Sequence, residues 1–169
     1  MALEIATLGG GCFWCTEAVF QQIRGVKKAE PGYAGGHVNH PSSDAVSEGY
    51  TGHAEVVRLH FDPAVVSYRA LLELFFTIHD PTTVNRQGND IGTQYRSVIH
   101  AHTPEQHEIA RKLMMEVARA WDVPVVTELS AATTFYPAED YHQNYFKLNG
   151  QQAYCTLVVA PKVDKARKF

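Results

Sequence analysis

The stretch GGGCFWC at residues 9–15 constrains the fold of this chain more than any other feature of the sequence. Residues 3–8, LEIATL, have the composition of a strand, whereas residues 12–23 have the apolar content of a helix that Gly25 would end. Because glycine adopts backbone conformations that other residues avoid, the three glycines between these segments predict a tight turn. The chain is therefore expected to begin with a strand that passes directly into a helix.

Two further segments have a clear pattern. Residues 53–61, HAEVVRLHF, alternate as a half-buried strand does, with Glu55 at the start of the apolar face and Arg58 on the opposite face. Residues 67–80, SYRALLELFFTIHD, predict a strongly apolar helix that Ser67 caps at its N-terminus. Both segments are expected to contribute to the core.

A second long helix is expected where Thr103, Pro104 and Gln106 combine a capping box with proline at the first helical position, and it should extend to about Trp121. The other expected elements are strands within residues 25–36 (interrupted by Pro31 and by a turn at Gly35 and Gly36), 95–101, 124–129 and 154–160, a loop over residues 37–52 and a short helix within residues 138–146.

This mixture of strands and helices predicts an α/β or α+β fold built on a compact sheet. The chain has 169 residues, of which 45% are hydrophobic and 20% are charged, an ordinary balance for a protein that buries a core. No repeat and no linker divides the sequence, so we expect one domain over residues 1–169.

The charge and the hydropathy pattern exclude several classes of protein. A formal net charge of -3 gives no broad attraction to nucleic acid or to acidic membranes. The N-terminus lacks the basic start and long apolar run of a signal peptide, and no apolar run approaches the length that spans a bilayer. We therefore expect a cytoplasmic protein that binds neither nucleic acid nor membranes.

The cysteines indicate chemistry rather than a disulfide framework. Cys12, Cys15 and Cys155 are too few and too unevenly placed for the framework of a secreted protein. Cys12 lies at the expected N-terminus of the first helix, where unpaired N–H groups and the helix dipole favour a reactive thiolate. The alternative, that Cys12 is a small buried apolar residue, is equally compatible with the spacing alone.

The spacing of Cys12 and Cys15 leaves other interpretations open. The pair could be a redox pair, because residues three apart on a helix are neighbours. A zinc site would need two more ligands, and neither Cys155 nor the nine histidines offer a second paired spacing. Acyl transfer by a cysteine and a histidine is a further alternative, although no separate motif for a base or an oxyanion site stands out.

Five motifs occur in order between residues 8 and 155: GCFWCTE, GYAGG, TGHAE, HDPTTVNRQGNDIGTQYRS and AEDYHQNY. Together they resemble the peptide methionine sulfoxide reductase A family. The resemblance implies a two-layer α/β sandwich with a ferredoxin-like core, in which helices cover one side of a mixed sheet and the C-terminal segment is irregular. It also implies a catalytic domain that reduces the S-epimer of methionine sulfoxide, free or in proteins.

The resemblance implies roles for individual residues. Cys12 would attack the sulfoxide sulfur, Glu55 would be the acid near the sulfoxide oxygen, and Tyr95 would donate a hydrogen bond to that oxygen. Phe13 and Trp14 would form the pocket for the S-methyl group. These roles agree with the chemistry, because a sulfoxide sulfur is a poor electrophile unless its oxygen is protonated or hydrogen-bonded.

Two carboxylates complete the expected site. By matching position Asp90 would help to position the reacting groups. A carboxyl group at the mouth of an apolar strand face resists ionisation, so burial should keep Glu55 protonated near neutral pH. Glu17, about one turn into the first helix, is interpreted as a solvated or supporting residue rather than as the acid.

After oxygen transfer Cys12 would be a sulfenic acid, which a second thiol must attack. Cys155 is favoured because it falls where the family's first recycling cysteine lies, and Cys15 is the alternative, which would require adjustment of the first helical turn. Thioredoxin would then reduce the disulfide. This cycle needs no cofactor and no metal, and a monomer suffices for it.

The chain departs from the family pattern in one loop. Ser43 stands where the family has a tyrosine that donates to the sulfoxide oxygen, and a serine hydroxyl is too short to reach as far. We hypothesise that Tyr50, in the same loop, swings in and replaces that tyrosine.

Overall fold

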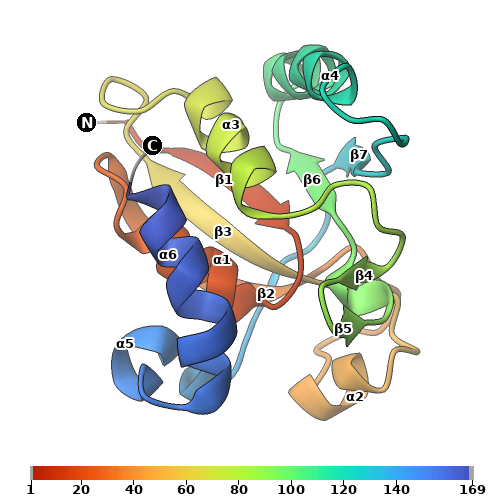
Figure 1. The fold of residues 1–169 in the computed structure, drawn as a ribbon. Coiled ribbons are helices and arrows are strands. Elements are labelled where there is room, and N and C mark those ends of the chain that lie inside the picture. Colours follow the sequence, from red (N-terminus) through yellow and green to blue (C-terminus); the bar gives the residue numbers. More distant parts are fainter. Residues whose placement is uncertain (1, 168–169) are drawn as a thin grey trace.

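The computed structural model of the protein describes residues 2–167 and contains a six-stranded mixed sheet (Figure 1). The strands lie in the order β7-β6-β1-β3-β2-β8, and β6 and β7 are the parallel pair. The other neighbours in this sheet pair antiparallel. Residues 1 and 168–169 of the expected domain lie outside the described part of the chain.

The bounds of the elements are as follows. The strands of the large sheet are β1 (Glu4–Gly9), β2 (Val26–Ala34), β3 (Ala54–Phe61), β6 (Val98–Ala101), β7 (Glu128–Ala131) and β8 (Tyr136–Pro137), and a small hairpin consists of β4 (Arg86–Gln87) and β5 (Asp90–Ile91). The helices are α1 (Phe13–Gln21), α2 (Ser43–Ser47), α3 (Tyr68–Ile78), α4 (Pro104–Ala118), α5 (Tyr145–Asn149) and α6 (Ala160–Ala166).

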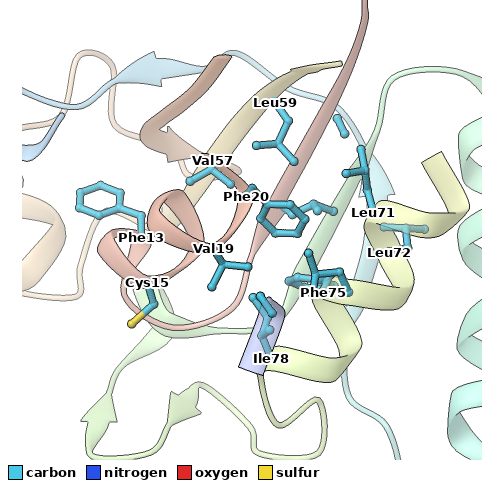
Figure 2. Close-up of a cluster of buried hydrophobic side chains, with 14 of the residues drawn as sticks. Phe13, Cys15, Val19, Phe20, Val57, Leu59, Leu71, Leu72, Phe75 and Ile78 are labelled. Atoms are coloured by element: carbon cyan, nitrogen blue, oxygen red, sulfur yellow. The ribbon is translucent and has the colours of Figure 1, made fainter. Parts of the chain in front are cut away.

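The core lies between the sheet and helices α1, α3 and α6 (Figure 1). Figure 2 shows Phe20 of α1 and Phe75 of α3 among the apolar side chains of β3, including Leu59. The opposite face of β3 carries the partly exposed Arg58. The alternation of the sequence along β3 is therefore confirmed, as is the expected α/β fold with helices packed against a mixed sheet.

The expected turn between β1 and α1 is confirmed, and its glycines are required by close contacts. A Cβ atom on Gly9 would lie 2.7 Å from the backbone oxygen of Glu55, and one on Gly10 would lie 2.9 Å from Cδ2 of His79. Gly11 has a φ of +87°, a conformation that other residues rarely adopt. The three glycines therefore let α1 begin directly against the sheet.

The caps of the two long helices follow the sequence. Ser67 Oγ accepts a hydrogen bond from the backbone of α3, as expected for an N-cap. Thr103 Oγ1 likewise accepts from Gln106 N at 3.0 Å, but the Gln106 side chain accepts from His102 N rather than completing the capping box with Thr103. Helix α4 ends before Trp121, the expected end of the helix.

The C-terminal segment differs from the prediction. Residues 154–160 were expected to form a strand, but Cys155–Val159 forms a π-helix that continues into α6. An apolar run cannot by itself distinguish a buried strand from a buried helix. The buried residues Cys155, Val159 and Val163 recur every four positions, so the helical form turns one side towards the core.

Smaller differences occur at other places. Strand β2 continues through Pro31. Strand β7 (Glu128–Ala131) includes only the last two residues of the strand expected at 124–129. The chain forms a 3₁₀ turn over Thr93–Tyr95 before β6, a further 3₁₀ turn over Asp140–His142 before α5, and the short helix α2 within the expected loop. No helix within residues 2–167 combines the length and the apolar content needed to cross a membrane.

Candidate active site

Cys12 is the N-cap residue of α1 and is partly buried. The glycine turn places it beside β3, because the backbone N–H of the next residue, Phe13, donates to Glu55 Oε1 at 3.1 Å. A strand carboxyl group and a helix N-terminus therefore meet at this thiol. Phe13 and Glu55 are 42 residues apart in the sequence, and the pairing of β1 with β3 brings them together.

Glu55 is 8% exposed, although it carries an ionisable group. Burial raises the pKa of Glu55 to about 8, the charge of Asp90 adds to the increase, and the hydrogen bond from Phe13 N opposes it. At neutral pH the carboxyl group is therefore mostly protonated. It can donate a proton to a group that develops negative charge beside Cys12.

The Cys12 thiol is in an environment that disfavours its charge. Burial raises the pKa of Cys12 well above its ordinary value, and negative charge on Glu55 and Cys15 would raise it further. Hydrogen bonds from Trp14 N and Tyr154 act in the opposite direction. The N–H groups at the helix N-terminus thus favour the thiolate, as expected, but the effect of burial on the pKa is larger.

Tyr154 belongs to this site and was missed in the sequence. Its hydroxyl donates to Asp90 Oδ2 at 2.6 Å. The same phenol lies close enough to Cys12 and Cys15 to lower the pKa of each thiol against the effect of burial. Tyr154 therefore lies beside both cysteines and the Asp90 carboxylate. Its one signal in the sequence was its position immediately before Cys155.

Tyr95 lies in the same cluster. Burial raises its pKa, and negative charge on Glu55, Cys12 and Asp90 raises it further, so the phenol stays neutral and able to donate a hydrogen bond. The backbone oxygen of Tyr95 accepts from Gly11 N at 3.2 Å, which joins its 3₁₀ turn to the glycine turn. The structure thus brings Tyr95 together with Cys12, Glu55 and Asp90, the other three groups expected at the reacting centre.

Phe13 and Trp14 have different surroundings. Phe13 is 2% exposed and belongs to the core (Figure 2). Its ring centroid lies 5.6 Å from that of Tyr33. Trp14 is partly buried and stacks on Tyr145, with the centroids 3.7 Å apart and the planes 4° apart. The Trp14 indole is therefore held from one side by α5, whereas Phe13 packs into the core.

Glu17 holds that part of the chain in place. It is 1% exposed, not solvated, and its carboxylate accepts from Asn144 N at 2.8 Å and from Tyr145 N at 3.2 Å. These N–H groups lie at the N-terminus of α5, where a carboxylate is favourable. Glu17 therefore supports the stack of Tyr145 on Trp14 and is not the acid.

The loop that departs from the family pattern does not place Tyr50 in the site. Tyr50 is 58% exposed, and the glycines on either side of its segment, Gly49 and Gly52, have φ values of +85° and +75° that turn the chain. In this structure Tyr50 therefore lies away from the place of the family's tyrosine, so the hypothesis would require it to move. Ser43, at the start of α2, lies instead with its Oγ 3.0 Å from His142 Nε2.

The two candidate resolving cysteines are buried. Cys15 is 2% exposed and Cys155 is 0% exposed, and all three cysteines are free thiols. Burial raises the pKa of Cys15, and negative charge on Cys155 would raise it further. Among residues 2–167, no group of three or more His, Cys, Asp or Glu side chains is arranged to hold a metal ion.

Comparison with known proteins agrees with this geometry. The family model for peptide methionine sulfoxide reductase matches residues 4–169. MsrA of Polynucleobacter asymbioticus is 59% identical over 167 residues, which cover 98% of this chain and 88% of the relative. The crystal structure of Mxr1 from Saccharomyces cerevisiae in reduced form matches with a TM-score of 0.86 and 36% identity over 90% of this chain and 89% of the yeast chain.

The yeast protein has also been solved in complex with Trx2, and that structure matches with a TM-score of 0.61 and 27% identity over 85% of this chain and 84% of the other. The family model, the curated relative and the reduced yeast structure each cover nine tenths or more of this chain. The protein with this glycine turn, thiol and buried carboxyl group therefore belongs to the peptide methionine sulfoxide reductase family, MsrA.

Proposed function

We propose that this chain reduces methionine sulfoxide, of the S-epimer and either free or within proteins, to methionine, with Cys12 as the nucleophile. The observation that carries the proposal is the buried Glu55 carboxyl group, whose pKa is raised to about 8 next to the turn that presents Cys12. A carboxylic acid beside a thiol suits the transfer of an oxygen atom from sulfoxide to thiol.

The reaction is written with its atoms and electrons balanced. The Cys12 sulfur attacks the sulfoxide sulfur while Glu55 protonates the oxygen and Tyr95 donates a hydrogen bond to it. The attack forms an S–S bond between Cys12 and the substrate, and the protonated oxygen then transfers to the Cys12 sulfur while this S–S bond and the S–O bond of the substrate break. Methionine leaves, and Cys12 is left as a sulfenic acid. The proton that the Cys12 thiol gives up returns Glu55 to its acid form.

The aromatic side chains are assigned to substrate binding. Trp14 would offer its partly buried indole to the S-methyl group, and Phe13 would support the pocket from the core. Apolar walls at this point exclude water from the reacting sulfur atoms. Asp90 would position the site through its hydrogen bond with Tyr154.

We assign Cys155 as the thiol that resolves the sulfenic acid, with Cys15 as the alternative. Cys155 lies in the π-helical turn before α6, and π-helical turns are rare and have functional uses. Attack by Cys155 on the sulfenic acid releases water and forms a disulfide. Thioredoxin would then reduce this disulfide, in keeping with the yeast relative that was crystallised with thioredoxin Trx2.

The remaining features of the proposal concern the protein as a whole. One catalytic domain acting as a monomer in the cytoplasm would suffice, since both sulfoxide reduction and disulfide formation use residues of this chain alone, and a reducing compartment keeps its three thiols free between cycles. No bound cofactor enters the cycle, because the electrons come from thiols.

Reaction of the reduced protein with methionine S-sulfoxide, without added reductant, tests the proposed function. We expect about one methionine per chain and the loss of about two free thiols, because two thiols give up the two electrons that the sulfoxide consumes when they form one disulfide. Methionine is measured by chromatography and thiols by titration under denaturing conditions. An acyl-enzyme at Cys12, or no methionine at all, would contradict the proposal in favour of a hydrolase.

The same assay identifies the resolving cysteine. Cys155→Ser should still release about one methionine per chain but should stop at a sulfenic acid that dimedone traps on Cys12. Cys15→Ser is the matched control and should lose two thiols as the unchanged protein does. The reverse result would assign the resolving role to Cys15.

Tyr95→Phe tests the hydrogen bond to the sulfoxide oxygen. We expect kcat/KM to fall by roughly tenfold to a hundredfold, since removal of one donor from a buried site costs about 1–3 kcal/mol. Tyr50→Phe is the control, because Tyr50 is 58% exposed and should leave kcat/KM unchanged. Equal effects of the two substitutions would show that Tyr95 has no special role.

A further inference from the structure

His142 connects the Trp14 indole to the loop in which this chain departs from the family pattern. Trp14 Nε1 donates a hydrogen bond to His142 Nδ1 at 3.0 Å, across 128 residues of sequence. On the other side of the ring, His142 Nε2 lies 3.0 Å from Ser43 Oγ. The two ring nitrogens of one histidine therefore join α1 to α2.

The chemistry of the partners determines the tautomer of this histidine. An indole N–H group can only donate, so His142 Nδ1 must be the acceptor and must carry no proton. In a neutral imidazole the proton then lies on Nε2 and is donated to Ser43 Oγ. Burial lowers the pKa of His142, which favours this neutral form although the charge of Glu139 opposes the decrease.

The ring has little freedom to leave this position. His142 is 7% exposed, and its ring centroid lies 5.1 Å from that of Phe13 and 4.2 Å from that of Tyr141. Figure 2 shows Phe13 projecting from the start of α1 at the edge of the core. The imidazole therefore has aromatic neighbours on two elements of the chain, and its two ring nitrogens each have a polar partner.

Ser43 in turn is held by Glu139. The backbone N–H of Ser43 donates to Glu139 Oε2 at 2.9 Å, and the other oxygen of this carboxylate accepts from the Tyr33 hydroxyl at 3.0 Å. Tyr33 lies in β2 and is 1% exposed, so the carboxylate ties α2 to the sheet. The small serine side chain fits between this carboxylate and the imidazole.

We propose that His142 is a positioning residue that orients the Trp14 indole for substrate, with Ser43 as the second anchor of the imidazole ring. This inference rests on the proposed function, in which Trp14 forms a wall of the substrate pocket. His142 acts on substrate binding through Trp14 and takes no part in oxygen transfer at Cys12.

The expected consequence is a change in KM rather than in kcat. Without an acceptor for its N–H group, the indole keeps its stack on Tyr145 but loses the hydrogen bond that determines its rotation within that stack. Binding of the methyl group then weakens, while Cys12 and Glu55 keep their mutual arrangement. A purely structural role for His142 would lower stability without separating KM from kcat.

The test uses two substitutions at position 142. His142→Leu removes the acceptor and should raise KM by about tenfold, the effect of one lost hydrogen bond, with kcat within about threefold of the original value. His142→Asn places an amide oxygen near the former site of Nδ1 and should restore most of the KM. Ser43→Ala keeps His142 Nδ1 as the acceptor for the Trp14 indole and removes only the second anchor of the ring. It should therefore raise KM by a smaller factor than His142→Leu.

A second readout is independent of activity. Trp14 and Trp121 are the two tryptophans of the chain, so Trp121→Phe leaves Trp14 as the single indole fluorophore. In this background His142→Leu should increase the quenching of Trp14 by acrylamide about twofold, and His142→Asn should not. Unchanged KM and unchanged quenching in His142→Leu, or equal defects in the Leu and Asn variants, would overturn the proposal.

Failure of the protein with His142 intact to form methionine would instead refute the proposed function, and the quenching data would still decide whether His142 orients Trp14.

Discussion

Replacement of Glu55 by Gln is expected to lower the rate of methionine formation by about 10²–10⁴-fold, the usual contribution of general acid catalysis. The amide keeps the size of the side chain and can still accept the hydrogen bond from Phe13 N, but it has no proton to give to the sulfoxide oxygen. The rate is measured in a single turnover without reductant, so that reduction of the disulfide does not mask the effect. Glu48→Gln, which changes an exposed carboxylate, is the control and should keep the full rate.

The pH profile gives an independent check on Glu55. Its pKa in the folded protein is raised to about 8, so the acid form is present at neutral pH and is lost as the pH rises through that value. We therefore expect kcat/KM to decline above about pH 8, and this decline should be absent in Glu55→Gln. A Glu55→Gln variant that keeps both the rate and the alkaline decline would eliminate Glu55 as the acid.

Phe20→Ala is expected to produce the largest loss of stability, about 3–5 kcal/mol in the free energy of unfolding. Phe20 is fully buried where α1 packs on the sheet and α3 (Figure 2), so its removal leaves a cavity that rigid neighbours cannot fill. The free energy is measured by urea unfolding followed by circular dichroism, with the slope compared between variants to confirm that the same transition is observed.

Leu148→Ala is the matched control for this substitution. Leu148 is 76% exposed on α5, so its truncation should change the free energy of unfolding by no more than about 0.5 kcal/mol. A loss of less than about 1 kcal/mol for Phe20→Ala would mean that α1 packs more loosely than its buried side chains indicate. Both variants should keep the glycine turn and hence the geometry around Cys12.

The position of Tyr154 gives the C-terminal helix a link to the reacting centre. Its hydroxyl donates to Asp90 and lies near the Cys12 and Cys15 thiols, and Tyr154 immediately precedes Cys155 in the chain. Movement of Cys155 towards an oxidised Cys12 would therefore displace this phenol from the thiols. In the proposed cycle, exposure of the disulfide to thioredoxin and displacement of this phenol would occur together.

Local sequence determined the elements whose causes lie within a few residues of each other. The glycine turn, the alternation along β3 and the N-caps Ser67 and Thr103 were all predicted, because φ/ψ preference, side-chain period and capping act between near neighbours. The ordered motifs also pointed to Cys12 and Glu55, which the structure places side by side.

Only the tertiary structure decided the features that depend on distant partners. Residues 154–160 have the composition of a strand but form a helix, because the face with Cys155 and Val159 packs into the core. The hydrogen bonds of Tyr154 to Asp90 and of Trp14 to His142 cross 64 and 128 residues. Such contacts follow from the order of strands in the sheet and from the packing of helices on it, which no local pattern of residues encodes.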